Sequence, residues 1–414
     1  MTKAFEPVNL MYVGLRFGSE TIPVGRLLAR DRKIFFEYGS DFLSSGLQIS
    51  PFKLPLKPGV QSFESALFDG LPGVFNDSLP DGWGRLILDR ALRARGLAPE
   101  QLSPLDRLAH VGIFGMGALV YEPDQADIAE NTEPLDLNTL ATQAAMVLEG
   151  EAGDILDDLV ALNGSSAGAR PKTMIGVNNR KTKLLHGVHD LPDGYEHWMV
   201  KFPNAGDGAD SGAIEYVYAQ MAVEAGIEMS ETHLFPSKNS PGFFGTKRFD
   251  RQHNNRLHLH TAAGLIHADF RAPSLDYEDL IELTMTLTRD LSQTEKMFRL
   301  AVFNVLGHNR DDHGKNFSYL MDREGAWRLS PAYDLVYSSG PGGEQSTMVM
   351  REGLNPGTSH LLKLAEAASV SEKKARAIID QCRAALAQWK NLAKNAGVGK
   401  DKISEIEKSL SQKS

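Results

Sequence analysis

Short runs of residues that favour β-strands open the chain and predict a β meander over residues 8–38. The runs "VNLMYVGLRF", "IPVGRLLAR" and "KIFFEY" are separated by Gly18-Ser19-Glu20 and by Asp31-Arg32. Gly, Ser and Asp are typical of turns between antiparallel strands. We therefore expect three short strands joined by tight turns.

Helices and strands then alternate through the middle of the chain. An apolar stripe after Asp81 predicts a helix that stops near Gly96, and another helix is predicted over about 138–162. "HWMVKFP" predicts a strand with Lys201 near its end, and "GAIEYVYAQMAVEAGI" predicts a helix that ends at Gly226. "ETHLFPS" and "GFFGTKRFDR" predict two further strands.

The order of these elements predicts two domains. The acidic stretch 123–137 is expected to link a first domain, residues 1–125, to a second domain, residues 138–414. In the second domain, strand-rich elements run to about residue 272 and a mostly helical lobe follows. We therefore expect an α+β fold with two lobes, and a cleft between lobes is a common place for a small ligand.

Composition narrows the class of protein. The 414 residues suggest two or three units, and the net charge of −9 gives no overall basic balance that would attract nucleic acid. Cys382 is the single cysteine, which excludes an internal disulfide and fits a reducing compartment. The sequence has no apolar run of about 20 residues and no signal peptide, so a cytoplasmic protein without a membrane partner is expected.

A dense polar cluster, "FNVLGHNRDDHGKNFSYL" (303–320), is the main candidate for chemistry. Asp311 precedes Asn316 by five positions, which is the Asp-to-Asn spacing of the catalytic loop in protein kinases. There, the carboxylate orients the attacking hydroxyl and the amide oxygen binds Mg²⁺. Asp334 follows in "LSPAYDLVY", after a predicted pair of short strands, and would be the second metal ligand.

The remaining parts of a nucleotide site occur in the order that a kinase requires. "NGSSAGARPK" (163–172) is a flexible loop rich in hydrogen-bond donors that precedes the strand of Lys201. Lys201 would meet the phosphates, and Glu215 in the next helix would hold that lysine. Each residue alone is weak support, since an isolated Asp-x4-Asn or strand lysine is common. The combination carries the prediction.

Other interpretations of the polar residues are weaker. His308 and His313 lack the i, i+4 spacing of a helical zinc pair, and no G-x-S-x-G motif supports Ser/His/Asp catalysis. His258 and His260 share one face of a strand and are expected to be structural, and Cys382 is expected to pack in a helix. Close packing is also expected for the glycines that end the first domain, which are Gly112, Gly115 and Gly117.

The sequence resembles the HipA family of serine/threonine kinases, the toxins of HipBA toxin–antitoxin systems. "NRDDHGKNFSYL…LSPAYDLV" resembles their catalytic segment, "SSAGARPK" their phosphate loop, "HWMVKFP" their ATP-lysine strand and "TKRFDR" their interlobe segment. "VGRLLARDRKIFFEY" and "FDGLPGVFNDSLPDGWGRLILDR" resemble their N-terminal module. The resemblance extends to about residue 390 and implies a bilobal, protein-kinase-like fold with an extra N-terminal module.

The resemblance also implies roles for individual residues. Asp311 would be the catalytic base, Asn316 and Asp334 would bind Mg²⁺, and Ser165 would be autophosphorylated. A phosphate on Ser165 would repel the ATP phosphates and give an inactive state. The backbone of Lys247 to Phe249 would hold the adenine. The implied ATP-binding residues are Ala167, Gly168, Ala169, Arg170, Pro171, Lys172, Lys201, Lys247, Arg248, Phe249, His313, Lys315, Asn316, Tyr333 and Asp334.

These observations predict an ATP- and Mg²⁺-dependent protein serine/threonine kinase of the HipA type. What the family implies is a toxin that phosphorylates a translation protein such as an aminoacyl-tRNA synthetase. A HipB-like helix-turn-helix antitoxin would be its partner and would bring it to DNA only indirectly. Two alternatives stay open: a catalytically weak HipA-fold ATP-binding regulator or antitoxin partner, and a metal-dependent hydrolase that uses Asp311, Asp312 and His313.

Overall fold

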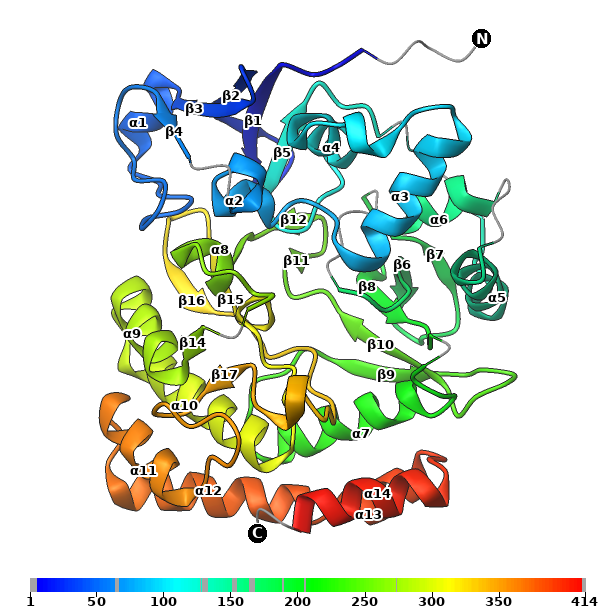
Figure 1. Ribbon diagram of the computed structural model, residues 1–414. Helices are drawn as coiled ribbons and strands as arrows, with labels where there is room; N and C mark the ends of the chain where they lie inside the picture. Colours follow the sequence, from blue (N-terminus) through cyan, green and yellow to red (C-terminus); the bar gives the residue numbers. More distant parts are fainter. Residues whose placement is uncertain are drawn as a thin grey trace. The chain divides into compact units, whose positions relative to one another are not determined.

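The computed structural model divides the chain into two compact units. It describes residues 6–63, 67–126, 128, 133–150, 155–163, 168–187, 190–204, 206–272 and 274–411. Unit 1 comprises Met1–Gly206, Lys247–His260 and Met321–Gly325, and unit 2 comprises Asp207–Thr246, Thr261–Leu320 and Ala326–Ser414. Helices and strands are mixed in both units, which confirms the expected α+β class (Figure 1).

The first part of unit 1 is an antiparallel sheet in the order β4-β3-β2-β1-β5. The meander predicted for residues 8–38 is confirmed, because its three runs form β1, β2 and β3. Along β1, Met11, Val13 and Leu15 are buried, whereas Leu10 and Tyr12 point to the exposed face. This alternation is the period of a strand with one covered face. The strands are β1 (Leu10–Arg16), β2 (Thr21–Arg30), β3 (Lys33–Tyr38), β4 (Gln61–Ser62) and β5 (Leu119–Glu122).

Four helices accompany this sheet along the chain. α3 begins after Asp81 and ends before Gly96, as predicted, and Gly96 adopts a positive φ of 81° that glycine accepts without strain. α4 begins with a capping box, in which Ser103 and Asp106 bind each other's backbone N–H. The helices are α1 (Ser40–Ser45), α2 (Gly73–Asn76), α3 (Gly82–Ala94) and α4 (Pro104–Val111).

The second part of unit 1 corrects one prediction. The single helix expected over about 138–162 is two helices, α5 (Leu137–Leu148) and α6 (Ile155–Asn163). Gly150 has a φ of 97°, which lies outside the helical region, so the first helix cannot continue through it. α6 packs against α3 and against strand β6.

Strands β6, β8 and β7 of unit 1 form antiparallel pairs with β6 in the centre. A short hairpin, β11 with β12, and strand β13 follow later in the chain. These strands are β6 (Lys172–Asn178), β7 (Leu184–His186), β8 (Tyr195–Lys201), β11 (Arg251–Gln252), β12 (Asn255–Arg256) and β13 (His258–Thr261).

Unit 2 is mostly helical (Figure 1). α7 packs against α12 and α13, and α10 packs against α9 and α12. The helices are α7 (Ser211–Glu224), α8 (Ala262–Ile266), α9 (Tyr277–Thr288), α10 (Leu291–Leu306), α11 (Thr358–Ala367), α12 (Glu372–Leu386), α13 (Trp389–Asn395) and α14 (Lys400–Ser411).

Unit 2 also contains several short strands. β9 and β10 form an antiparallel pair, and β14 pairs with β17 in parallel. They are β9 (Thr232–Phe235), β10 (Phe243–Lys247), β14 (Leu275–Asp276), β15 (Ser318–Met321), β16 (Trp327–Leu329) and β17 (Thr347–Met348). None of the helices in the described ranges is long and apolar enough to cross a membrane.

Candidate functional site

The polar cluster of residues 303–320 forms a loop in unit 2 between two buried elements. α10 ends at Leu306, and β15 begins at Ser318. Between them, Gly314–Asn316 form one turn of 3₁₀ helix. The buried ends of α10 and β15 anchor the loop on both sides. We call residues 307–317 the catalytic loop, after the role that the sequence predicts for them.

Asp311 and Asn316 are held together within this loop. The backbone carbonyl of Asp311 accepts a hydrogen bond from Nδ2 of Asn316 at 2.6 Å. The side chain of Asp311 is 64% exposed, and its Oδ1 lies 3.9 Å from Nε2 of His313. The loop therefore presents one carboxylate to solvent and fixes the amide group of Asn316 beside it.

An aromatic ring that the sequence did not point to lies next to this loop. Nζ of Lys315 lies 4.3 Å from the centroid of the Phe270 ring, and Cζ of Arg271 lies 5.2 Å from it. The ring of His313 is 5.7 Å from the same ring, centroid to centroid. A cation above an aromatic face is attracted to it, so Phe270 orients Lys315. Phe270 lies in an irregular segment with no motif, and nothing in the sequence marks it.

Tyr333 connects the predicted metal ligand Asp334 to the catalytic loop. Its hydroxyl donates a hydrogen bond to the carbonyl of Lys315 at 2.6 Å and lies 2.6 Å from Oγ of Ser318. Asp334 has a positive φ of 57°, which is uncommon for a residue other than glycine. Such conformations are concentrated at functional sites, where the surrounding structure holds them.

Asp312 is buried, although it is the neighbour of the exposed Asp311. Its carboxylate accepts hydrogen bonds from Tyr277, Gln345 and the backbone of residues 346–347. Burial raises the pKa of Asp312 to about 6, while the hydrogen bonds from Tyr277 and Thr347 act to lower it. These partners cannot be identified from the sequence alone, because they lie more than thirty positions away on either side.

In unit 1, the two lysines predicted to meet phosphates lie opposite each other. Lys172 begins β6 and Lys201 ends β8, and the two are direct partners in the antiparallel pair. Lys172 is 5% exposed and Lys201 is 9% exposed. The register therefore brings the two lysines to the same end of the strand pair, and both stay predicted contacts of the ATP phosphates.

The loop before Lys172 is fixed to the start of α3. Asp81 accepts a hydrogen bond from the backbone N–H of Gly168, and the backbone N–H of Trp83 donates to the carbonyl of Gly168 at 3.0 Å. At the other end of the loop, the carbonyl of Pro171 accepts a hydrogen bond from the N–H of Phe202 at 2.8 Å.

Some of the residues predicted to act in this loop lie outside the described part of the chain. The described part of the loop begins at Gly168, so the predicted residues Ser165 and Ala167 lie outside the described residues. Ala169 is exposed, and Arg170 is half-buried. Both stay predicted ATP neighbours.

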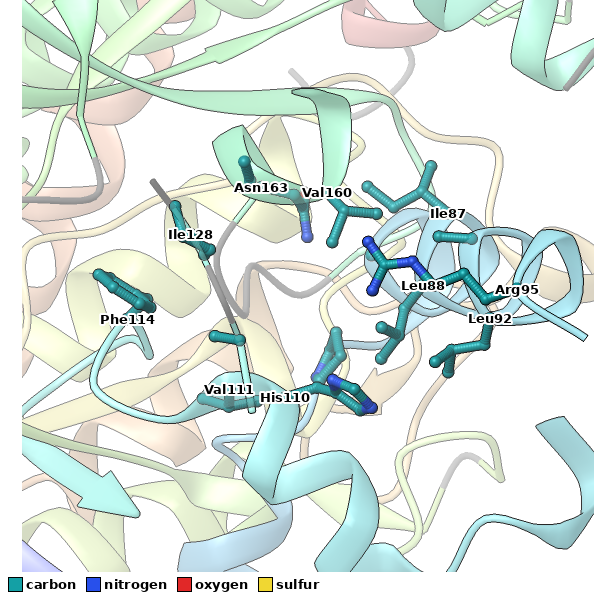
Figure 2. Close-up of a pocket in the computed structure, with 15 residues that line it drawn as sticks. Ile87, Leu88, Leu92, Arg95, His110, Val111, Phe114, Ile128, Val160 and Asn163 are labelled. Atoms are coloured by element: carbon teal, nitrogen blue, oxygen red, sulfur yellow. The ribbon is translucent and has the colours of Figure 1, made fainter. Parts of the chain in front are cut away.

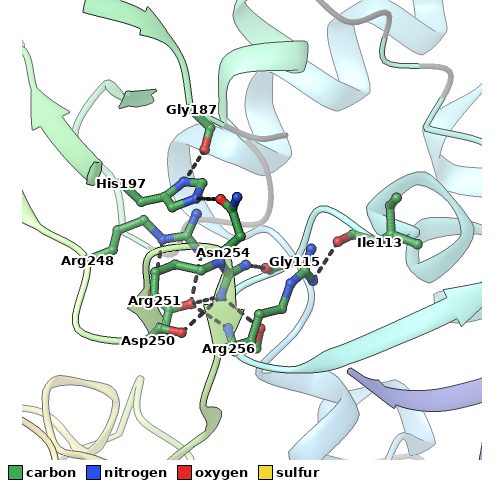
Figure 3. A network of polar contacts seen from close by, with 10 residues as sticks. Ile113, Gly115, Gly187, His197, Arg248, Asp250, Arg251, Asn254 and Arg256 are labelled. Carbon is green, nitrogen blue, oxygen red and sulfur yellow. Dashed lines mark hydrogen bonds and ion pairs between the residues drawn. The ribbon is translucent and has the colours of Figure 1, made fainter. Parts of the chain in front are cut away.

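The segment predicted to hold adenine has a buried ionic network beside it (Figure 3). The guanidinium of Arg248 binds both carboxylate oxygens of Asp250, at 3.0 and 2.8 Å, and Arg251 binds the same carboxylate at 2.6 Å. Although burial raises the pKa of Asp250, the two arginines hold it below its usual range. The side chain of Arg248 is therefore engaged in this network, which leaves only its main chain for a ligand.

The main chain of this segment is also partly engaged. The N–H of Arg248 donates to the carbonyl of His197 at 2.9 Å, so it is already paired. Nζ of Lys247 lies 3.1 Å from Oε1 of Glu196. Contact of Lys247 and Phe249 with adenine stays a prediction.

Glu215 and Lys201 belong to different units. Glu215 lies in the first half of α7 in unit 2 and is 2% exposed, and Lys201 lies in unit 1. A buried carboxylate requires a cation or hydrogen bonds. The burial of Glu215 therefore excludes the interpretation that it is a solvent-exposed residue of the helix. Its predicted pairing with Lys201 stays a prediction.

A small cavity in unit 1 contains none of the predicted ATP-binding residues (Figure 2). It measures about 80 Å³ and lies among α3, α4 and α6. Burial lowers the pKa of His110 at its edge, so this imidazole is neutral near pH 7. Most of its lining is apolar, including Ile87, Leu88, Leu92, Val111, Phe114, Ile128 and Val160.

The residues expected to be structural are so in the structure. Nε2 of His258 lies 2.8 Å from the carbonyl of Ile49, and Nδ1 of His260 lies 2.6 Å from Oδ2 of Asp77. Cys382 is buried, and burial raises its pKa to about 12. Among the described residues, no group of three or more His, Cys, Asp or Glu side chains could hold a metal ion.

Comparison with known proteins identifies two family domains along the chain. The HipA N-terminal domain matches residues 18–122, and the HipA-like C-terminal domain matches residues 164–389. The chain therefore belongs to the HipA family, as the sequence resemblance predicted.

Two individual proteins illustrate the similarity. The chain is 26% identical over 304 residues, 67% of either protein, to the putative kinase Y4mE of Sinorhizobium fredii (strain NBRC 101917 / NGR234). It has the fold of HipA in the solved complex of the Shewanella oneidensis MR-1 toxin–antitoxin system HipA, HipB and its operator DNA. That match has a TM-score of 0.68 at 16% identity and covers 97% of this chain and 95% of the other.

Proposed function

We propose that this protein is an ATP- and Mg²⁺-dependent protein serine/threonine kinase. The observation that carries the proposal is the contact between Asp311 and Asn316, at the spacing of a kinase catalytic loop. The contact leaves the Asp311 carboxylate 64% exposed, so a substrate hydroxyl can reach it. Phosphoryl transfer depends mainly on positioning and charge stabilisation, which a fixed loop of this kind provides.

Groups of unit 1 would bind the phosphates. Lys172 and Lys201, buried and opposite each other, supply two positive charges. Gly168 brings its main chain close to Lys172, because a Cβ on this glycine would lie 2.4 Å from Nζ of Lys172. A glycine loop next to lysines is the usual solution for a phosphate site, since it offers backbone N–H groups and charge together. The main chain of Lys247 and Phe249 would contact the adenine.

Groups of unit 2 would bind Mg²⁺ and orient the hydroxyl. The Asn316 amide oxygen and the Asp334 carboxylate are hard oxygen donors of the kind that Mg²⁺ prefers, so these two residues would hold the ion. The ion would neutralise charge on the phosphates. Asp311 would accept a hydrogen bond from the substrate hydroxyl and receive its proton as the phosphoryl group is transferred. His313 and Lys315 would stand near the nucleotide.

A transfer assay with labelled ATP tests the proposal. Wild-type protein is expected to label itself or a protein in a cell lysate, and Asp311→Asn is expected to lose this activity. Asp401→Asn, an exposed carboxylate in the first turn of α14, is the matched control and should keep it. Full activity of Asp311→Asn would contradict the assignment. Tight ATP binding without any transfer would instead favour a catalytically weak regulator.

We further propose that the kinase is the toxin of a toxin–antitoxin pair. The support is membership of the HipA family and the fold shared with HipA of the HipA–HipB–operator complex. A HipB-like helix-turn-helix protein would bind it and bring it to DNA, and its substrate would be a translation protein such as an aminoacyl-tRNA synthetase. Expression should arrest growth, and co-expression of that antitoxin should restore it. A phosphoproteome compared with Asp311→Asn would identify the substrate.

Autophosphorylation at Ser165 would switch the kinase off. The added charge would stand in the loop that leads to Lys172 and would repel the ATP phosphates. Ser165→Ala should therefore prolong activity during incubation with ATP, because the inactive form cannot accumulate. If the variant changes neither self-labelling nor the decay of activity, this regulatory proposal fails.

A further inference from the structure

Asp311 and Asp312 are neighbours in the sequence with opposite surroundings. The side chain of Asp311 is 64% exposed, whereas Asp312 is fully buried, at 0% exposure. Burying a carboxylate is costly unless hydrogen bonds replace its water. The contacts of Asp312 therefore indicate what this residue does.

The carboxylate of Asp312 is held by four donors. Oδ1 accepts hydrogen bonds from the backbone N–H groups of Ser346 and Thr347, at 2.9 and 3.1 Å. Oδ2 accepts from the hydroxyl of Tyr277 at 2.7 Å and from Nε2 of Gln345 at 3.0 Å. The hydroxyl of Thr347 also donates to the backbone carbonyl of Asp312. These contacts saturate the carboxylate and fix its orientation.

The same segment, residues 345–347, also binds the main chain before Asp311. Ser346 donates to the carbonyl of Arg310 from its N–H at 3.1 Å and from its hydroxyl at 2.9 Å. Nε2 of Gln345 donates to the carbonyl of Asn309 at 3.2 Å. Residues 345–347 thus bind the catalytic loop on both sides of Asp311, and Asp312 is the charged residue among these contacts.

A second set of contacts fixes Asp312 to the helices of unit 2. Tyr277 is the first residue of α9, and its hydroxyl accepts a hydrogen bond from Nδ2 of Asn304 at 2.9 Å. Asn304 lies in the last turn of α10, and its Oδ1 accepts from Nδ2 of Asn309 at 3.0 Å. The catalytic loop is therefore tied to both helices as well as to residues 345–347.

We propose that Asp312 is a positioning residue: it fixes the catalytic loop to residues 345–347 and so holds the Asp311 carboxylate toward the substrate hydroxyl. This inference rests on the proposed kinase function. Asp312 is buried and does not contact the substrate. It acts on Asp311 through the main chain of the loop. Displacement of a reacting group by about 1 Å can lower a rate about a hundredfold, so the loop has to be held firmly.

Hydrogen exchange tests the contact without any activity. In Asp312→Asn, an NH₂ group replaces one of the two carboxylate oxygens. Both oxygens accept hydrogen bonds in the wild type, so the NH₂ group meets other donors in either orientation of the side chain. The backbone amides of residues 346–347 should then exchange at least about tenfold faster than in wild type, since an opening free energy lowered by 1.4 kcal/mol gives this factor. Unchanged protection of these amides would overturn the proposal.

Kinetics then separate positioning from general damage. Asp312→Asn should lower kcat about 10- to 100-fold, while KM for ATP and the Kd of ADP stay within about twofold of wild type. Equal losses in kcat and nucleotide affinity would overturn the proposal. Asp290→Ala is the matched control, because Asp290 also accepts a backbone N–H, that of Ser292 at 2.8 Å, at the far end of α10. It should keep the wild-type kcat.

A second variant covers the case in which Asp312→Asn does not fold. Gln345→Met keeps the length of the side chain and removes its two hydrogen bonds, to Asp312 and Asn309. It should lower kcat by a smaller factor, with ATP affinity unchanged, and wild-type kcat in this variant would overturn the proposal. If wild-type protein transfers no phosphate at all, the kinase assignment fails, and hydrogen exchange still decides whether Asp312 holds residues 346–347.

Discussion

Asp81, just before α3, accepts a hydrogen bond from the backbone N–H of Gly168, a residue 87 positions further along the chain. Gly82, the residue after Asp81, packs directly on the predicted phosphate loop. A Cβ on Gly82 would lie 2.5 Å from the carbonyl oxygen of Gly168. The family's N-terminal domain and the predicted phosphate loop are therefore in direct contact within unit 1. A change at residues 81–82 is transmitted to the loop through its main chain.

We expect Gly82→Ala to weaken ATP binding about tenfold. The new methyl group overlaps Gly168, and the φ of 46° at Gly82 adds backbone strain. Calorimetric titration with a non-hydrolysable ATP analogue measures the change. Gly46→Ala is the control, because Gly46 has a φ of 75° and no atom within 4 Å of the new Cβ. A wild-type Kd in Gly82→Ala would show that the contact does not control the loop.

Phe270→Leu should lower the affinity for ATP by a few-fold. The substitution removes the aromatic face below Nζ of Lys315, an interaction of about 0.5–1 kcal/mol at an exposed position. Arg271→Ala removes the other cation from the same ring and should leave ATP affinity unchanged. Equal effects of the two substitutions would indicate that the ring does not act through Lys315.

Asp250→Asn should destabilise unit 1 by about 3–5 kcal/mol, because two buried guanidinium groups would lose their shared carboxylate. Urea unfolding measures this loss. The lowered pKa of Asp250 means that the ionised form is favoured in the folded protein. Its contribution is therefore present above the unfolded pKa near 3.8 and declines as the pH falls below that value. Full stability of the variant at pH 7 would contradict this account.

His197 should make the protein less stable in mild acid. Burial lowers its pKa from 6.5 to about 4, so the unfolded chain takes up a proton first as the pH falls. The free energy of unfolding should thus decrease between pH 6.5 and 4 by about 3 kcal/mol from this residue, at about 1.4 kcal/mol per unit of pKa. Urea unfolding of His197→Gln at pH 7 and pH 4.5 should show a smaller difference than wild type.

Local patterns in the sequence predicted much of the fold. The three strands of the meander and α3 follow from residues that are close in the chain. The break between α5 and α6 was missed although the sequence carries a signal for it, because Gly150 follows the apolar run that ends at Leu148 and glycine is typical of a helix end. Asp311 and Asn316 lie within one loop, so their proximity follows from the sequence, while their catalytic and metal-binding roles stay predictions.

The contacts that support the candidate site could not be predicted in the same way. Opposition of Lys172 and Lys201 depends on the register of β6 and β8, which the two strand predictions do not fix. The burial of Asp312 could not be predicted either, because its donors lie 33 to 35 positions away. Such partners become visible only when separate segments are folded together.

The burial of Cys382 has a practical consequence. This thiol is the sole cysteine of the chain, and a pKa of about 12 keeps it protonated and slow to react at neutral pH. A cysteine introduced on the surface would therefore be the preferred target of a maleimide dye in otherwise native sequence. Fluorescent or spin-labelled probes can thus be attached one at a time, with no need to remove a native thiol first.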